Sequence, residues 1–304
     1  MSGAESESAG EPTVVVKVGG AKAVDPAGAV GDVAHLAANG RSVVVVHGGS
    51  TVVDETLERL GIEPEYVESA SGVTGRFTDA ETMEAFAMAM AGKLNTELTA
   101  EFRSAGVDAV GLSGVDGGLL SGPRKSAVRV VEDGKRKIRR GDHSGKIESV
   151  NADLLAGLLA DGYTPVVSPP MAGDEGDGEV TPVNADADRA AAAVAGALGA
   201  DLVLLTDVSG VYADPDDPET RIDAAATPAE LATVEDAAEG FMGKKVMAAR
   251  EALEGGSGRV VIADANVHDP VVAALGGEGT TVERSALDEA ANGDAAETEG
   301  GETA

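Results

Sequence analysis

The sequence contains short, unbroken runs of apolar residues that end at paired glycines. The two clearest runs are TVVVKVGG (13–20) and SVVVVHGG (42–49). Continuous apolar character, as opposed to alternation, is typical of strands buried on both faces of a parallel sheet. These runs therefore favour a fold in which helices cover both faces of the sheet.

Helical segments alternate with the apolar runs. Residues 25–40 have an N-cap candidate in Asp25, a proline at the next position and a closing glycine at Gly40. We expect further helices at 50–60 and 79–104, and further strands at 107–113, 163–169, 200–210 and 259–263. This alternation predicts an α/β fold, a three-layer α/β/α sandwich with a mostly parallel central sheet.

The two ends of the chain differ in composition from the part between them. Residues 1–12 are rich in Ser, Glu and Gly, and residues 285–304 carry six acidic side chains and no basic one. Such segments have little apolar surface to bury. We therefore expect disordered acidic tails at 1–12 and 285–304 around a folded part at 13–284.

Charge and composition exclude several classes of function. The chain has 53 acidic and 23 basic side chains, a net charge of -30, which repels phosphate backbones and argues against a nucleic-acid partner. It has no cysteine, which excludes disulfides and zinc–thiolate sites. No signal peptide and no apolar run of about 20 residues is present, so we expect a cytoplasmic protein with no membrane partner. The charge itself is typical of a halophilic cytosolic protein.

Three predicted strands end in loops suited to anion binding: VKVGG (16–20), VHGGS (46–50) and TDVSG (206–210). In open parallel sheets, ligands bind beyond the carboxyl ends of the strands. Paired glycines let backbone N–H groups approach an anion closely, although a plain tight turn uses the same residues. Neither the dinucleotide-binding nor the P-loop glycine pattern is present, so a nucleotide here would need another loop design.

Lysines stand at unusual positions in this acidic chain. Lys17 interrupts an apolar strand, where it is either a charge on an edge strand or a cation directed at phosphate. Lys244 and Lys245 form a pair within GFMGKKVMAAREAL.

Polar residues that could orient such lysines precede a predicted helix. Asn184, Asp186 and Asp188, in NADAD (184–188), are helix caps on one interpretation and a partner for two lysines on the other. Arg76, in SGVTGRFTDAE, is either a surface charge or a bidentate clamp for a substrate carboxylate.

Six motifs occur together in a characteristic order: KVGG (17–20), VHGG (46–49), GRFTD (75–79), NADAD (184–188), GADLVLLTDVSGVY (199–212) and GKKVMAA (243–249). Over residues 13–283 the chain resembles the amino-acid kinase family, and within it the N-acetylglutamate kinase group. The resemblance implies that a substrate carboxylate attacks the γ-phosphate of ATP to give an acyl phosphate, with Mg²⁺ held mainly by the phosphates. It also implies a homodimer, an amino-acid substrate lobe at 13–199 and a nucleotide-binding lobe at 200–284.

The same resemblance implies roles for individual residues. Lys17 and Lys245 would stabilise the transferring phosphoryl group, and Asp188 would orient both lysines. Lys245 is preferred over Lys244 because the family pattern reads K-V-x-A-A, and Asp188 over Asp186 because of its distance to the segment that begins at Gly199. Substrate binding would fall to Gly48, Gly49, Arg76 and Asn184, and nucleotide binding to Gly19, Gly20, Thr206, Asp207, Gly210 and Tyr212. No side chain is expected to ligate a metal.

One position departs from the family pattern. The family commonly has HGGG, and here Ser50 stands in place of the third glycine. Serine keeps the backbone N–H, so we expect function to survive.

A basic segment lies within the acidic chain. Residues 124–146 hold nine of the 23 basic side chains and only three acidic ones. SAVRVV, EDG and KRKIRR predict a β-hairpin, whose charges would at the least block edge-to-edge pairing.

The hairpin, together with the segments GDHSGKIESVN and GLSGVDGGLLSGPRK, carries a second resemblance. In these segments the chain resembles the branch of these kinases whose substrates are bound to an amino-group carrier protein of the LysW type. Such carriers are small and acidic, and they present glutamate or 2-aminoadipate on a C-terminal glutamate. The resemblance implies that the hairpin docks the carrier through Lys135, Arg136, Lys137, Arg139 and Arg140.

The function expected is therefore ATP-dependent phosphorylation of carrier-linked glutamate or 2-aminoadipate, in arginine or lysine biosynthesis. The main alternative is N-acetylglutamate kinase, which acts on the free acetylated amino acid. A nucleoside-monophosphate kinase of the same fold and a non-catalytic nucleotide-binding regulator are further alternatives.

Overall fold

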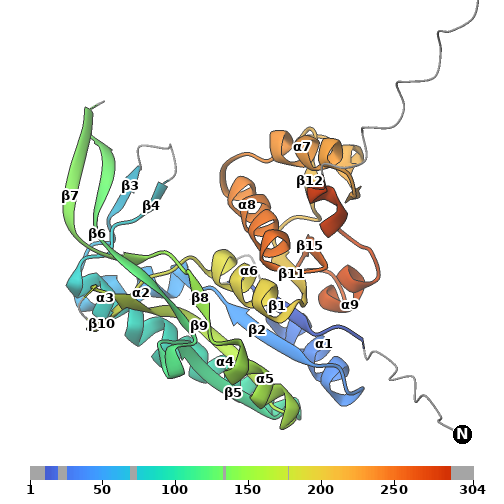
Figure 1. The fold of residues 1–304 in the computed structure, drawn as a ribbon, viewed down its shortest axis with the longest axis horizontal. Coiled ribbons are helices and arrows are strands. Elements are labelled where there is room, and N and C mark those ends of the chain that lie inside the picture. Colours follow the sequence, from blue (N-terminus) through green and yellow to red (C-terminus); the bar gives the residue numbers. More distant parts are fainter. Residues whose placement is uncertain (1–10, 20–25, 69–73, 133–134, 177, 289–304) are drawn as a thin grey trace, which may run out of the picture.

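The computed structural model describes residues 11–19, 26–68, 74–132, 135–176 and 178–288 (Figure 1). Gly20, Asp25 and most of both predicted tails lie outside these ranges. Of the C-terminal tail, the described part begins with a 3₁₀ turn, Arg284–Leu287, in which Ala286 is buried. The packed part of the chain therefore extends a few residues beyond the boundary predicted at 284.

A twelve-stranded sheet forms the centre of the described structure. Its strand order is β14-β16-β15-β11-β1-β2-β9-β6-β7, with β5 and β10 paired to β9 and β8 paired to β6. The strands β15, β11, β1, β2, β9 and β5 pair with one another in parallel. This arrangement confirms the mostly parallel central sheet.

The bounds of the sheet strands are β1 (Val14–Val18), β2 (Val43–His47), β5 (Ala109–Gly114), β6 (Leu120–Glu132), β7 (Lys135–Gly145), β8 (Ser149–Val150), β9 (Thr164–Asp174), β10 (Val180–Val183), β11 (Asp201–Thr206), β14 (Ala224–Ala225), β15 (Arg259–Asp264) and β16 (Thr280–Glu283). Two small hairpins lie outside the sheet: β3 (Tyr66–Glu68) with β4 (Thr74–Arg76), and β12 (Val211–Tyr212) with β13 (Arg221–Ile222).

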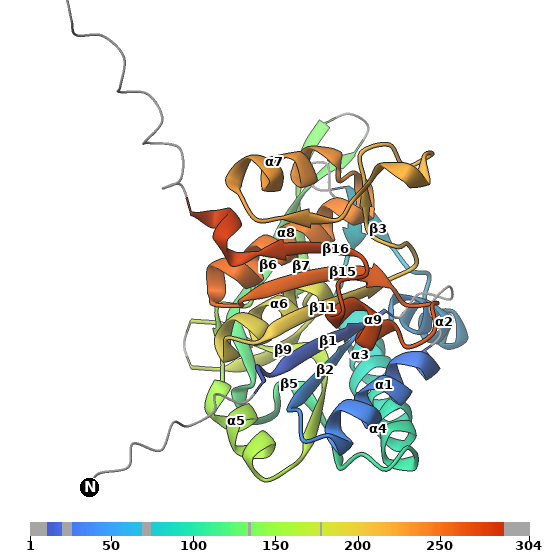
Figure 2. The same cartoon turned by 90° about the vertical axis from the view of Figure 1, so that its right-hand side faces the viewer.

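Helices cover both faces of the sheet, which confirms the three layers (Figure 2). The helices are α1 (Pro26–Ala38), α2 (Ser50–Leu60), α3 (Ala80–Ala87), α4 (Asn95–Ser104), α5 (Ala152–Ala160), α6 (Ala187–Leu198), α7 (Pro228–Ala237), α8 (Gly240–Gly255) and α9 (Pro270–Leu275). On one face, α1, α4 and α9 pack against the sheet; on the other, α5, α6 and α8 do so. The single helix predicted at 79–104 is instead α3, a π-helix at Met88–Leu94, and α4.

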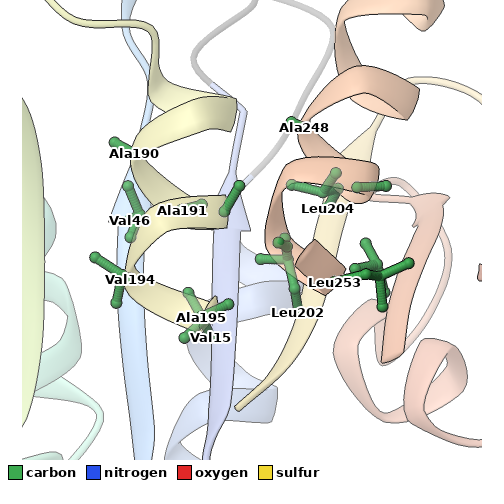
Figure 3. Close-up of a cluster of buried hydrophobic side chains, with 14 of the residues drawn as sticks. Val15, Val46, Ala190, Ala191, Val194, Ala195, Leu202, Leu204, Ala248 and Leu253 are labelled. Atoms are coloured by element: carbon green, nitrogen blue, oxygen red, sulfur yellow. The ribbon is translucent and has the colours of Figure 1, made fainter. Parts of the chain in front are cut away.

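Side chains of β1 and β2 alternate between the two faces. Val14, Val16 and Val18 join the cluster beneath α1 and α4, whereas Val15 and Val46 join the cluster beneath α6 and α8. Figure 3 shows this second cluster. There the small side chains of α6 lie close to the strands: Ala190, Ala191, Val194 and Ala195. This packing fixes the first turn of α6 above the carboxyl ends of the strands.

Helices α6 and α8 touch at glycines. A side-chain carbon on Gly196 would lie 2.9 Å from the Cα of Gly255, and backbone cannot move aside as a flexible side chain can. We predict that Gly196→Ala lowers the free energy of unfolding by about 1–3 kcal/mol. The matched control is Gly157→Ala, in the open on α5, which should raise it by about 0.5–1 kcal/mol. Urea denaturation of both variants measures the difference, and an unchanged Gly196→Ala protein would contradict the close contact.

Candidate active site

Lys17 lies in the middle of the sheet, near the carboxyl end of β1. Its partners across the strands are Val46 of β2 and Leu204 of β11. Because β1 is flanked on both sides, the interpretation of Lys17 as an edge-strand charge is wrong. The side chain is 8% exposed, and a lysine buried to that degree needs a partner of opposite charge.

That partner is Asp188, which also binds a second lysine. Lys17 Nζ lies 2.7 Å from Asp188 Oδ1, and Lys245 Nζ lies 3.0 Å from Asp188 Oδ2. The Asp188 side chain is 12% exposed. The three side chains come from β1, α6 and α8, so the cluster exists only when both helices are docked on the sheet.

The two aspartates of NADAD have different partners. Asp186 caps α6, and its side chain accepts hydrogen bonds from the backbone N–H groups of Asp188 and Arg189. Asp188, in the first turn of the helix, is thereby left to pair with the lysines. Both interpretations of this motif therefore hold, each for a different residue.

Burial and charge act in opposite directions on Asp188. Burial raises the pKa of the carboxyl, but the two lysines outweigh it and lower the pKa to about 2 from an ordinary 3.8. Asp188 is therefore ionised at physiological pH. Two ammonium groups around one carboxylate leave one positive charge uncompensated at the end of the sheet.

Lys244 and Lys245 also have different partners. Lys244 Nζ donates a hydrogen bond of 2.9 Å to the backbone oxygen of Thr74 and lies 5.5 Å from the ring centroid of Phe241. The structure thus brings Lys245, and not Lys244, to Asp188.

The glycine turn after β2 is closely packed from behind. A side-chain carbon on Gly49 would lie 2.2 Å from Leu94 Cδ1 and 2.6 Å from Met90 Sδ, both in the π-helix. The backbone of Gly49 has a φ of 170°, which any residue adopts, so the glycine is required by packing. The turn leads into α2, whose N-cap provides no side-chain hydrogen bond.

Arg76 and Asn184 lie around this region without touching the lysine–aspartate cluster. Arg76 Nη2 donates to Asp54 Oδ1 (2.6 Å), Ser50 O (3.0 Å) and the Tyr66 hydroxyl (3.0 Å). Its Nε is buried and has no hydrogen-bond partner within the described ranges. Asn184 Nδ2 donates to Thr78 Oγ1 at 3.0 Å.

The segment after β11 contains the residues assigned to the nucleotide. Thr206 ends the strand and is buried, Asp207 is exposed, and Tyr212 lies in β12. Gly210 has a φ of +145°, and a side-chain carbon there would lie 2.6 Å from Thr280 Oγ1. Gly210 is therefore required by its conformation and by its contact with Thr280. Gly19 directly follows β1, whereas Gly20 lies outside the described residues.

The basic segment forms the predicted hairpin, β6–β7, which projects from the body of the molecule beside β3 and β4 (Figure 1). Residues paired across an antiparallel ladder share a face, so the register divides the five cations between two faces. Lys135, Lys137 and Arg139 share one face with Val128 and the buried Val130. The other face holds Arg136, Ile138, Arg140 and Arg129.

Arg139 is bound to the body of the molecule. Its guanidinium pairs with both carboxylate oxygens of Glu65 and lies 4.0 Å from the ring centroid of Phe77. On the opposite face, Ile138 is 66% exposed.

Three buried polar groups were missed from the sequence. His47 and Asn95 are hydrogen-bonded to each other behind the glycine turn. Asp142, at the base of the hairpin, accepts from the backbone N–H of Thr78 (3.4 Å) and from Ser144. A polar residue at the end of an apolar run was the available signal for His47, whereas the polar surroundings of Asn95 in GKLNTEL offer none.

Comparisons with known proteins identify the family of this chain. The sequence matches the description "Amino acid kinase family" over residues 12–264. The chain belongs to the amino acid kinase family. It is 45% identical over 271 residues to the "[LysW]-aminoadipate kinase" of Deinococcus radiodurans, covering 88% of this chain and 91% of that protein.

Other relatives are similar too. The "Acetylglutamate kinase" of Methanopyrus kandleri is 45% identical over 222 residues, covering 72% of this chain and 84% of that protein. Among solved structures, a carbamate kinase from Giardia lamblia has a TM-score of 0.65 at 18% identity, covering 90% of this chain and 99% of that one. At that identity the likeness establishes the fold alone, and it confirms the predicted fold class.

The described residues lack two features that would point to other kinds of function. They include no helix with the length and hydrophobicity needed to span a bilayer. They also include no group of three or more His, Cys, Asp or Glu side chains placed to hold a metal ion.

Proposed function

We propose that this kinase phosphorylates the side-chain carboxylate of glutamate or 2-aminoadipate attached to an acidic carrier protein of the LysW type, in arginine or lysine biosynthesis. The observation that carries the proposal is the basic hairpin, whose strand β7 runs from its cationic end to the segment of Asn184. At the base of β7, Asn184 N donates to His143 O (2.7 Å), and Gly145 N donates to Asn184 O (2.9 Å). A carrier bound to the hairpin would thus lie along the same strand that contacts Asn184.

The proposed chemistry is direct transfer. A carboxylate oxygen of the substrate attacks the γ-phosphorus of ATP, the bond to the β,γ-bridging oxygen breaks, and ADP leaves as the acyl phosphate forms. Lys17 and Lys245 stabilise the negative charge on the equatorial oxygens, and Asp188 holds both ammonium groups in place. Gly48, Gly49, Arg76 and Asn184 bind the substrate, and Gly19, Gly20, Thr206, Asp207, Gly210 and Tyr212 bind the nucleotide.

Mg²⁺ fits this site as a partner of the nucleotide. Mg²⁺ prefers oxygen ligands and usually keeps several of its water ligands. In enzymes that use ATP, it binds the phosphate groups of the nucleotide. Asp188, the buried carboxylate of the cluster, is already paired with two lysines, so the phosphate oxygens would be the main ligands. The chain's own contribution is then the fixed positive charge of the lysines.

N-acetylglutamate kinase is the second candidate. The Methanopyrus kandleri relative favours it, because it matches at the same identity of 45%. A free acetylated amino acid, however, gives no reason for a cationic hairpin in a chain of charge -30. The turnover rates of purified enzyme with ATP, measured once with carrier-linked glutamate and once with acetylglutamate, decide between the two candidates.

The lysine roles can be tested with a control from the next residue. We predict that Lys17→Ala and Lys245→Ala each lower kcat by about 100-fold or more, because fixed charge next to the transferring group is lost. Lys244→Ala should keep kcat close to that of the wild type, since Lys244 bonds to Thr74 O. Steady-state kinetics and ATP binding by calorimetry are the measurements, and ATP binding should persist in at least one of the first two variants. Normal turnover in either Lys17→Ala or Lys245→Ala would remove the proposed role.

The docking proposal predicts a selective effect on one substrate. Reversal of the four exposed hairpin cations, Lys135, Arg136, Lys137 and Arg140, should raise KM for the carrier-linked substrate by roughly tenfold or more, since each exposed pair contributes under about 1 kcal/mol. Arg139 is kept, because its guanidinium pairs with Glu65. The kcat and the KM for ATP should stay nearly unchanged, and the defect should shrink without vanishing in molar KCl. A charge-reversed enzyme equal to the wild type at low and high salt would put the acetylglutamate alternative first.

The two faces of the hairpin provide matched variants. One double variant combines Arg136→Glu with Arg140→Glu, and the other combines Lys135→Glu with Lys137→Glu. Both change the charge by the same amount on the same strand. We expect the arginine pair to account for most of the effect on KM, because it flanks the exposed Ile138, whereas Arg139 on the lysine face is bound to Glu65. Equal effects from the two pairs would mean that docking does not distinguish the faces.

We also propose that the protein works as a homodimer in a salt-rich cytoplasm. The charge of -30 supports the salt-rich setting, and the family resemblance supports the dimer. Light scattering coupled to size exclusion would test the dimer.

Salt should stabilise such a protein. Because ions screen the repulsion between its carboxylates, we predict that Tm rises from low to molar KCl. Calorimetric or fluorescence melting curves measure this, and a Tm that is flat or falls would exclude the halophilic interpretation.

A further inference from the structure

His47 is a buried histidine directly before the glycine turn. It is 3% exposed, and burial lowers its pKa to about 4, so the ring is neutral at physiological pH. Both ring nitrogens have partners: Nδ1 lies 3.1 Å from Gly48 O, and Nε2 lies 3.2 Å from Asn95 Nδ2. A neutral imidazole carries one proton, so these partners determine which nitrogen holds it.

Asn95 makes that assignment. Its Nδ2 is 2.8 Å from the backbone oxygen of Val166, and a carbonyl can only accept. The atom facing it, which also faces His47, is therefore the amide nitrogen. The Asn95 oxygen points the other way, toward Gly111, where a side-chain carbon would lie only 2.2 Å from it. His47 Nε2 thus accepts, and the proton is on Nδ1, which donates to Gly48 O.

This hydrogen bond fixes the orientation of one peptide group. The peptide between Gly48 and Gly49 is planar, with its C=O and N–H on opposite sides. Side chains alternate along a strand, so His47 of β2 lies on the same face as Val43 and Val45, the face covered by α4. By the same alternation, Lys17 of β1 lies on the same face as Val15, the face covered by α6 and α8. When Gly48 O is held toward the α4 face, Gly49 N–H is directed toward the face that carries Lys17 and Asp188. In the described part of the chain, that N–H donates to no other group.

We propose that His47, fixed in its Nδ1–H form by Asn95, is a positioning residue that orients the Gly49 N–H toward the transferring phosphoryl group. The opposite tautomer would place a lone pair of Nδ1 against Gly48 O, and the repulsion would rotate the peptide. The inference rests on the proposed phosphoryl transfer only for its kinetic part, because the tautomer is a property of the free protein.

Two substitutions separate orientation from packing. The substitution His47→Asn places an amide nitrogen where Nδ1 was. It therefore keeps a donor for Gly48 O and loses the contact with Asn95. The substitution His47→Gln places the terminal atoms of its side chain where Nε2 was. It therefore keeps the contact with Asn95 and loses the donor for Gly48 O. The proposal predicts that His47→Gln lowers kcat by roughly tenfold or more with little change in KM, and that His47→Asn keeps more of the kcat despite a lower Tm.

A purely structural role of His47 predicts the reverse order, with kcat following Tm. The proposal is therefore overturned if a folded His47→Gln enzyme has normal kcat, or if His47→Asn is the slower enzyme. The kinetics use ATP with carrier-linked glutamate or 2-aminoadipate, and acetylglutamate is assayed in parallel. If the wild type uses only the acetylated substrate, the carrier proposal fails, and the comparison of variants proceeds on that substrate.

The tautomer can be measured without any substrate. The chain has four histidines, so the ¹⁵N imidazole signals of His47 in the ¹⁵N-labelled protein can be assigned by elimination, with His35→Gln, His143→Gln and His268→Gln as the references. We expect a protonated Nδ1 and an unprotonated Nε2, unchanged between pH 8 and about pH 5 because burial keeps the ring neutral. A proton on Nε2 would overturn the proposal even if neither variant folds.

Discussion

A single buried carboxylate between two lysines determines how the parts of this molecule are arranged. Lys17 is 171 positions before Asp188 in the chain and Lys245 is 57 after it, and the three residues come from a strand and two helices. A buried charge is costly unless it is paired, so Asp188 requires both α6 and α8 to lie close to the end of β1. The glycine contact between Gly196 and Gly255 allows that close approach. Helix packing and site geometry are thus one constraint, and its product is a fixed excess of positive charge suited to phosphate.

Charge is distributed at two length scales in this protein. The whole chain carries -30, which repels any acidic macromolecule at long range. The hairpin reverses the sign locally, and its register exposes Arg129, Arg136 and Arg140 around one isoleucine. In high salt the long-range field is screened over a few ångströms, so short-range pairs and apolar contact would decide the proposed docking. An exposed Ile138 among arginines meets both needs.

Sequence patterns predicted the sheet because burial of a strand is a local property of its residues. The run at 13–18 became β1 at Val14–Val18, and the lysine inside it was identified as exceptional for the same reason. The break in the helix predicted at 79–104 could not be predicted, since MAMAGKL has no residue that excludes an ordinary α-helix. The partners of His47 and Arg76 also depend on contacts across 48 and 22 positions, for which one sequence holds no signal. The motifs thus predicted the three residues that the fold brings together, Lys17, Asp188 and Lys245, and the fold determined their partners.

The π-helix at Met88–Leu94 explains why one glycine of the turn is required and another is replaced. Its wider turn brings Met90 and Leu94 against Gly49, where no side-chain carbon fits, and leads directly into Asn95 behind His47. Ser50, where the family commonly has a third glycine, is an exposed first residue of α2 and meets no such obstacle. The need for glycine is therefore set by what packs behind the turn, and ends at the position where the helix begins. Serine keeps the backbone N–H on which the proposed phosphate contact depends.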